Sequence, residues 1–273
     1  MTFWPVQRLV DKVRNIISVA REVGLYSGAA AKLYGVTNFL ENGMFGRVGR
    51  AGLTAIKQRQ YEGGTEVTQS LAASFALLED LLALQPRREC MLFAHTEQRI
   101  LVAADASYEN GVGKAGFLVV IKPGTPEESR VGRILDIPRQ LYRQWGDQTT
   151  YIAQLELVVL LAVMVECAES IRGSRGLWFT DNTAALMALV NGKSDSPSLD
   201  VMARFVHVAC FALHAAPYFE YVESRSNWAD EISREGLQGS WAPQHNFALG
   251  VCTFVPQLLG LPCAALARVF SYF

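Results

Sequence analysis

Cysteine is scarce in this sequence, and none of the five cysteines lies in a Cys-x-x-Cys pair. This argues against a disulfide scaffold and against a structural zinc site. Few and scattered cysteines fit a reducing compartment, so we expect the cytoplasm or the nucleus. Histidine is also scarce, and the four residues do not form a metal-binding motif. A Gly-x-Ser-x-Gly nucleophile motif, a P-loop and a dinucleotide-binding fingerprint are all absent.

Charged residues make up only 19% of the 273 residues, whereas half of the sequence is hydrophobic. This composition excludes a disordered, collagenous or coiled-coil protein, and the length suggests one or two domains with a buried core. The first apolar runs are interrupted by Arg8, Asp11, Lys12 and Arg14, so the N-terminus does not resemble a secretory signal.

The net charge of −1 conceals an uneven distribution of charge. Residues 1–60 contain nine Lys and Arg residues and three Asp and Glu residues, a net charge of +6, which leaves −7 for the rest. A basic segment beside an acidic body points to a polyanionic partner, although a solvated helical surface explains it equally well.

Hydrophobic periodicity predicts three regions, of which the first, residues 1–92, is helical. Amphipathic helices are predicted at 4–23, 27–41, 48–60 and 65–84. The second region, residues 97–237, is predicted to be a mixed α/β domain. Its strands are predicted at 100–104, 115–121, 130–137, 176–180 and 218–222, and its helices at 150–170, 183–191, 196–215 and 227–234. Short turns between the first three strands favour an antiparallel meander within a five-stranded mixed sheet.

The third predicted region is an apolar tail at residues 238–273. Residues 247–267 contain no charged residue and are long enough to cross a membrane. Gly250, Pro256, Gly260 and Pro262 would break a helix here, however. We therefore favour a tail that packs on the domain, or one left exposed by a missing partner, over a membrane span.

Four acidic residues stand where a plain hydrophobic core would exclude them. Asp105 and Asp181 each end an apolar strand, and Asp230 lies in the first turn of the final helix. Taken singly, these three are explained as a turn residue, a helix cap and a helix-start residue. Glu156 is harder to explain, because it opens an apolar helix and a buried carboxylate is costly without compensation.

The four acids have a joint explanation if the first and fourth strands of the domain are neighbours. The carboxyl ends of these strands then meet, and the long helix and the final helix bring the other two acids to the same place. Converging carboxylates repel one another unless divalent cations lie between them, and Mg²⁺ prefers oxygen ligands. Two such ions roughly 4 Å apart can activate a water and stabilise the leaving oxygen in phosphodiester cleavage.

The order of elements and four short motifs resemble the ribonuclease H family. The motifs are Ala104-Asp105-Ala106-Ser107, Gln154-Leu155-Glu156, Thr180-Asp181-Asn182 and Asn227-Trp228-Ala229-Asp230-Glu231-Ile232-Ser233-Arg234. The last motif is similar to the ribonuclease H domains that follow reverse transcriptases in retroelements. The resemblance implies a ribonuclease H-like fold and cleavage of the RNA strand of RNA–DNA hybrids. It also implies two Mg²⁺ or Mn²⁺ ions, with four metal ligands that are the catalytic residues, Asp105, Glu156, Asp181 and Asp230.

A less specific resemblance concerns the basic helical segment. Lys32-Leu-Tyr-Gly-Val-Thr-Asn-Phe and Met44-Phe-Gly-Arg-Val-Gly-Arg resemble the thumb or connection region between a polymerase and its ribonuclease H domain. The sequence has no Tyr/Phe-x-Asp-Asp polymerase motif. A reverse transcriptase polymerase domain is therefore an expected partner, and a helical accessory domain is the alternative for this segment.

The sequence departs from the family in two places. The stretch Glu223-Ser-Arg-Ser-Asn lacks the catalytic-loop histidine of many members, and residues 196–215 lack the basic protrusion of some cellular members. Contacts to an RNA–DNA hybrid must then come from other residues, through phosphates or sugars. The candidates are Ser107, Asn182, Arg47, Arg50, Lys57 and Arg59, although structural roles explain Ser107 and Asn182 equally well.

The function that we infer from the sequence is a ribonuclease H-type endonuclease of a retroelement. Two alternatives stay open. The same fold carries DNA nucleases, resolvases and transposases, which substrate preference would distinguish. A non-catalytic nucleic-acid-binding relic would bind without Mg²⁺, although the presence of all four carboxylates argues against decay.

Overall fold

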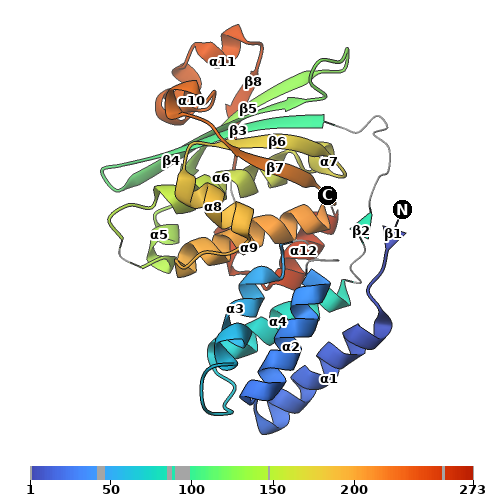
Figure 1. Cartoon of the computed structure of the whole chain (residues 1–273). Coiled ribbons are helices and arrows are strands. Elements are labelled where there is room, and N and C mark those ends of the chain that lie inside the picture. The colour runs from blue at the N-terminus through green and yellow to red at the C-terminus, as the bar shows by residue number, and fades with distance from the viewer. Residues whose placement is uncertain are drawn as a thin grey trace. The chain divides into compact units, whose positions relative to one another are not determined.

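The computed structural model describes residues 2–41, 47–84, 88–89, 99–146, 148–253 and 256–272 (Figure 1). The chain divides into two compact units. One contains Met1–Ala94 and Pro262–Ala265, and the other contains His95–Leu261 and Leu266–Phe273.

The first unit is helical, as the sequence predicts. It contains α1 (Gln7–Val23), α2 (Ser27–Leu40), α3 (Arg50–Arg59) and α4 (Gln69–Ala83), with β1 (Thr2–Phe3) paired to β2 (Arg88–Glu89). Apolar side chains at helical spacing, such as Val13 and Ile17, are fully buried. The chain turns after α1 at Gly24, which has a φ of 90° and approaches the Thr65 carbonyl too closely for a side chain.

The second unit is built on a six-stranded mixed sheet with the order β7-β6-β3-β4-β5-β8. Its strands are β3 (Arg99–Glu109), β4 (Val112–Ile121), β5 (Ser129–Ile137), β6 (Arg175–Thr180), β7 (Ala216–Tyr221) and β8 (Ala248–Val251). The first three form the predicted antiparallel meander. Asn110 and Gly111, both at positive φ, make the tight turn between β3 and β4.

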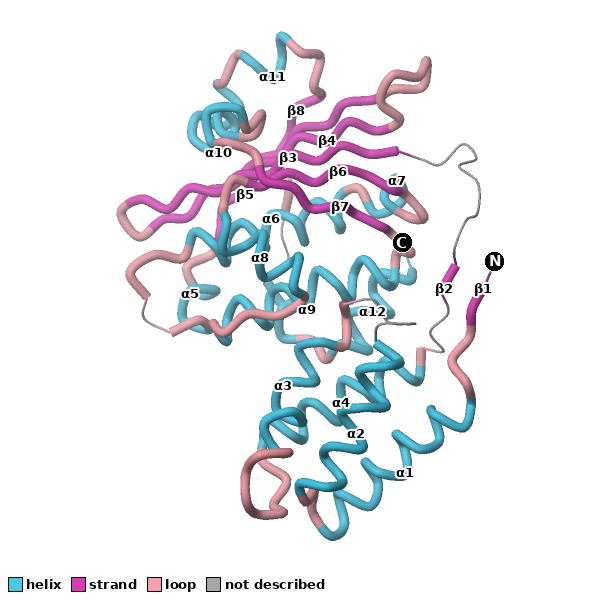
Figure 2. Tube along the Cα trace, viewed as in Figure 1, coloured by secondary structure: helices cyan, strands magenta, loops and turns pink. Residues whose placement is uncertain are grey.

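The first and fourth predicted strands are neighbours, as the joint explanation of the acids requires. β6 pairs with β3 in parallel, and β7 pairs with β6 in parallel. Helices α6 (Ile152–Glu166), α8 (Thr183–Asn191) and α9 (Pro197–Ala212) cover one face of this sheet, whereas α10 (Asp230–Glu235) and α11 (Trp241–Gln244) lie on the other (Figure 2). The structure therefore confirms a mixed α/β fold preceded by a helical segment, which also contains the short β1–β2 pair.

Helix α6 is the central helix of the face that α6, α8 and α9 cover. Every residue from Gln154 to Met164 is buried, which agrees with an apolar sequence that shows no polar side. The predicted single helix over 150–170 is divided, because the chain leaves helical geometry at Cys167 before α7 (Ala168–Ile171). The remaining short elements of the domain are α5 (Gln140–Gln144), η2 (Ser224–Ser226) and η3 (Gly236–Gln238).

The sheet has one strand more than the five predicted. Residues 248–251, within the expected apolar tail, form β8, which pairs in parallel with β5. The backbone N–H of Cys252 continues this pairing by donating to the Ile134 carbonyl at 2.8 Å. A run of four residues inside a uniformly apolar segment has no alternation that would mark it as a strand.

The rest of the apolar segment forms η4 (Pro256–Gly260) and α12 (Cys263–Tyr272). Within the part of the chain that the structure describes, no helix combines the length and the apolar character that a membrane crossing needs.

Candidate metal centre

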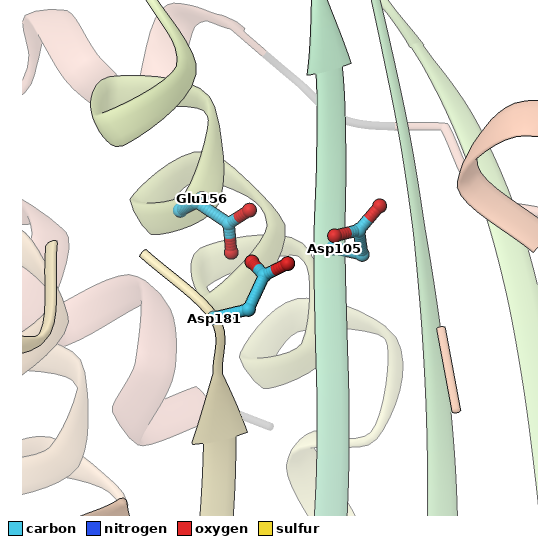
Figure 3. Close-up of side chains that lie close together, drawn as sticks. All are labelled: Asp105, Glu156 and Asp181. Carbon is cyan, nitrogen blue, oxygen red and sulfur yellow. The ribbon is translucent and has the colours of Figure 1, made fainter. Parts of the chain in front are cut away.

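Three of the four predicted acids meet where β3 and β6 part. The parallel pairing of these strands ends at Ala103 and Phe179, although β3 continues to Glu109. Asp105 lies beyond the last pair on β3, and Asp181 directly follows β6. Glu156 reaches the same gap from the first turns of α6 (Figure 3).

The carboxylates of Asp105, Glu156 and Asp181 point toward one another (Figure 3). Each offers one oxygen, and these three oxygens all lie within 4.8 Å of one another. Asp105 and Glu156 are buried, with exposed fractions of 3% and 1%, whereas Asp181 is partly exposed. The site is therefore closed toward the core and open on the side of Asp181. We call these three residues the carboxylate cluster.

Glu156 is held by both strands that border the gap. Its Oε1 accepts a hydrogen bond from the backbone N–H of Ala106 at 3.1 Å, and its Oε2 accepts one from the Thr180 hydroxyl at 3.1 Å. The Ala106 N–H is able to donate here because it lies past the end of the β3–β6 pairing. These bonds explain how a carboxylate is tolerated within an apolar helix.

Asp105 is held by a residue of α10, on the face of the sheet opposite α6. The Ser233 hydroxyl, on α10, donates to Asp105 Oδ2 and also lies 2.9 Å from the Asp230 carbonyl. Helix α10 comes this close because Gly116 of β4 has no side chain, since a Cβ there would lie 2.7 Å from Ile232. Asp105 is thus fixed by a helix distant in sequence.

The cluster is electrostatically unfavourable without a cation. Burial, together with the charges of Asp181 and Asp230, raises the pKa of Asp105 to about 6, and the hydrogen bond from Ser233 opposes this shift. Burial, followed by the charges of Asp105 and Asp181, raises the pKa of Glu156 well above its usual range. Among the residues that the structure describes, no Lys or Arg forms an ion pair with the cluster.

The donor set fits a hard divalent cation. Mg²⁺ and Mn²⁺ take oxygen ligands, and a bound cation would relieve the repulsion and the burial cost that raise the two pKa values. Asp105, Glu156 and Asp181 would hold such an ion.

Asp230, the fourth predicted ligand, lies outside the carboxylate cluster. Its Oδ1 accepts a hydrogen bond from Arg234 Nε at 2.9 Å, one turn further along α10. Its charge contributes to the raised pKa of Asp105, so it lies near the cluster without joining it. The sequence spacing predicts the approach of Asp230 but does not reveal its pairing with Arg234.

Ser224 is a site residue that sequence reasoning missed. Its hydroxyl, in η2 between β7 and α10, donates to Asp181 Oδ2 at 2.5 Å. An exposed serine in a polar loop carries no signal that would identify it. The serine thus links this loop to the open side of the cluster.

Asn227 is a second residue that the sequence motif contained but whose role was not recognised. Its side-chain amide is buried and donates to the Ala104 carbonyl at 2.9 Å, next to Asp105. Its Oδ1 accepts a hydrogen bond from the Ala229 N–H at 3.2 Å. Asn227 therefore joins the start of α10 to β3.

Replacing Asn227 by Ala is expected to lower the free energy of unfolding by about 1–2 kcal/mol, because the Ala104 carbonyl loses this buried partner. Urea unfolding followed by circular dichroism measures the change. Ser226→Ala, at an exposed position in the same loop, is the matched control and should leave stability unchanged. Equal stability of the Asn227→Ala and Ser226→Ala proteins would show that the amide does not join the two elements.

Two predicted nucleic-acid contacts in this domain form hydrogen bonds within the protein. The Ser107 hydroxyl donates to the Ser233 carbonyl at 3.5 Å. Asn182 is the N-cap of α8, where its Oδ1 accepts from the Ala185 N–H at 3.0 Å. Local capping therefore explains Asn182, as it explains many residues of this type at helix starts.

The four predicted basic contacts of the first unit differ in their surroundings. Arg47 and Lys57 are exposed. Arg50 Nε lies 3.4 Å from Glu41 Oε2, so it partly compensates a carboxylate that is 1% exposed. Arg59 is buried, and its guanidinium donates to the Glu66 carbonyl at 2.8 Å, so it supports the loop after α3.

The sequence matches no known family model, and no curated protein matches it significantly. Among solved structures, ribonuclease H1 from the halophilic archaeon Halobacterium salinarum NRC-1 aligns with a TM-score of 0.37 and 16% identity, over 52% of this chain and 99% of that chain. The N-terminal ribonuclease H domain of Rv2228c from Mycobacterium tuberculosis aligns with a TM-score of 0.34 and 13% identity, over 55% and 99%.

Proposed function

We propose that this protein is a metal-dependent endonuclease of ribonuclease H type, which hydrolyses the RNA strand of RNA–DNA hybrids with two Mg²⁺ or Mn²⁺ ions. The observation that carries the proposal is the convergence of Asp105, Glu156 and Asp181 from three separate elements at one gap in the sheet. Buried carboxylates with raised pKa values and no ion pair within the described chain are costly to maintain, which argues for a function that needs them.

The chain's own residues would divide the work as follows. Glu156, fixed by Ala106 and Thr180, and Asp105, fixed by Ser233, provide the rigid side of the centre. Asp181, on the open side, faces the solvent from which substrate arrives. When bound, the ions would lower the pKa of the attacking water and stabilise the leaving oxygen.

Asp230 would complete the ligand set. Its pairing with Arg234 is an i, i+4 pair whose arginine is 59% exposed. Such pairs contribute only about 0.3–0.5 kcal/mol, so exchanging Arg234 for a divalent cation costs little.

The biological context is proposed from the sequence motifs. The Asn-x-Ala-Asp-x-x-Ser-Arg stretch supports a retroelement origin and a reverse transcriptase polymerase domain as partner, in the cytoplasm or the nucleus. The exposed Arg47 and Lys57 would supply phosphate contacts that weaken with salt.

Incubation of the full chain with an end-labelled RNA–DNA hybrid tests the proposed function. Cleavage of the RNA strand is expected with Mg²⁺ or Mn²⁺ and should stop when a chelator is added. Double-stranded DNA, a DNA junction and double-stranded RNA of the same sequence serve as comparison substrates. Preferential cleavage of a DNA substrate would favour the resolvase or transposase alternative. Binding of the hybrid without cleavage in either metal would favour the non-catalytic alternative.

A further inference from the structure

Three aromatic rings form a row along the segment that contains α10 and α11, and the proposed chemistry does not use them. The ring centroids of Trp228 and Trp241 are 5.9 Å apart, with an angle of 31° between the ring planes. Trp241 and His245 stack at 3.9 Å and 21°. We call Trp228, Trp241 and His245 the aromatic row.

Both ends of the aromatic row are exposed. Trp228 keeps 41% of its surface accessible, and His245 is also exposed. Phe247, whose ring centroid lies 6.1 Å from that of Trp241, is buried, and Trp241 is partly buried. The packing of this region therefore accounts for Phe247 and Trp241 but leaves the exposure of Trp228 unexplained.

Hydrogen bonds hold the segment of Trp241 and His245 in place. The Glu231 carboxylate accepts from the backbone N–H groups of Ser240 at 3.2 Å and Trp241 at 2.7 Å. The His245 ring nitrogen Nδ1 lies 2.7 Å from the Trp241 carbonyl. Arg130 donates to the His245 carbonyl at 2.9 Å. Trp241 and His245 are thus preorganised, so little rotamer entropy would be lost at these two rings when a flat ligand stacks on the row.

The row starts at the edge of the proposed metal centre. Trp228 follows Asn227, which is bonded to the carbonyl next to Asp105, and precedes Asp230 by two residues. Arg225 and Arg234, with side chains 82% and 59% exposed, lie in the same stretch of chain. Their ion pairs are at the surface and exchange easily for phosphate groups.

We propose that the aromatic row binds unpaired bases of a nucleic-acid strand that extends from the metal centre. Stacked aromatic rings flanked by arginines are the surface on which single-stranded bases stack, without sequence preference. This inference rests on the proposed function, because it assigns to the same site a hybrid that carries a single-stranded extension.

Binding measured in chelator, where no cleavage occurs, tests the aromatic row. The probes are a fluorescein-labelled RNA–DNA hybrid with an oligothymidine overhang and the same hybrid with blunt ends. The wild-type protein should bind the overhang hybrid more tightly by about tenfold in fluorescence anisotropy. Trp228→Ala should remove this preference, whereas Trp228→Phe should retain most of it, because phenylalanine keeps a ring that can stack.

Two further variants keep the test decisive. His245→Ala removes the other exposed ring and should reduce the preference even if Trp228→Ala does not fold. Tyr218→Ala removes an aromatic side chain that is 64% exposed on β7, outside the row, and should leave the preference intact. Equal affinity of the wild-type protein for both hybrids would overturn the inference, as would an equal loss of preference in Tyr218→Ala.

The same substrates separate this inference from the proposed function. Cleavage of hybrids in Mg²⁺ without any overhang preference would sustain the nuclease and reject the aromatic row as a base-binding surface. An overhang preference that depends on Trp228, in a protein that cleaves nothing, would sustain the row and reject the nuclease.

Discussion

Replacing Glu156 by Gln is expected to lower the rate of hybrid cleavage by about a thousandfold or more while leaving the protein folded. A metal ion supplies several kcal/mol of transition-state stabilisation, and losing about 4 kcal/mol slows a reaction roughly a thousandfold. Glutamine removes the negative charge at the most buried position of the cluster. Single-turnover cleavage of the labelled hybrid in Mg²⁺ measures the loss.

The local contacts explain why this variant should fold. The glutamine carbonyl can accept from the Ala106 N–H as Glu156 Oε1 does, and its amide can donate to the Thr180 hydroxyl oxygen, which also accepts from the Asn182 N–H at 3.2 Å. Both polar contacts of the side chain are therefore kept. Loss of a buried negative charge should also make the metal-free protein more stable.

Asp181→Asn is the companion variant on the open side of the cluster. It keeps the shape of the side chain and its contact with Ser224, and it should also lose cleavage. Glu223→Gln is the matched control, because Glu223 pairs with Arg225 at 3.1 Å in the neighbouring loop and is outside the cluster. Full activity in both Glu156→Gln and Asp181→Asn would show that the cluster is not the metal centre of the reaction.

The second large effect concerns stability and pH in the absence of divalent cations. The pKa of Asp105 is raised from an ordinary value of 3.8 to about 6 in the folded protein. Between these values the folded state binds more protons than the unfolded state, so stability falls as pH rises. The stabilising effect of protonated Asp105 is thus complete below about pH 4 and lost above about pH 6.

Replacing Asp105 by Asn should remove this pH dependence. A difference of about two pKa units corresponds to roughly 2–3 kcal/mol, by which the variant should be more stable than the wild type near neutral pH in chelator. Glu156, which both proteins keep, also has a raised pKa, so the free energy of unfolding of both should fall further as pH rises above that range. Urea unfolding at a series of pH values measures both effects.

Divalent cations should reverse the order of the two proteins. Mg²⁺ or Mn²⁺ that binds only the folded state raises the free energy of unfolding with the logarithm of the ratio of ion concentration to Kd. Because Asp105→Asn removes a metal ligand, the variant should gain less stability from the ion than the wild type. Asp136→Asn, at an exposed position on β5, is the control for a general effect of removing a carboxylate. Identical pH profiles for wild type and Asp105→Asn would contradict the assignment of Asp105 to a buried, strained cluster.

The sequence predicted the elements well because their signals are local. The uniformly apolar run of α6 indicates a buried helix, and Asn110-Gly111 marks the turn between two strands without reference to the rest of the chain. The sequence predicted five strands, whereas the sheet has six. The missed strand, β8, has no local signal and forms by pairing with the free edge of β5.

The candidate site likewise contains residues that the sequence indicated and residues that only the structure revealed. Carboxylates placed after apolar strands and within an apolar helix pointed to Asp105, Glu156 and Asp181, since burial of a charge is unusual enough to be read from one stretch of sequence. Ser224 and Ser233 carried no such signal, because a serine becomes informative only when its hydroxyl meets a carboxylate.

By itself, then, the sequence determined the mixed α/β character of the second unit, the helical character of the first and the residue types available for a metal. Only the tertiary structure decided that β6 pairs with β3 and that the pairing stops at Ala103. It also decided that Asp230 turns to Arg234, and that Arg59 faces a loop rather than solvent. The physical reason is that propensity and periodicity act over neighbouring residues, whereas strand register and side-chain pairing depend on segments that only folding brings together.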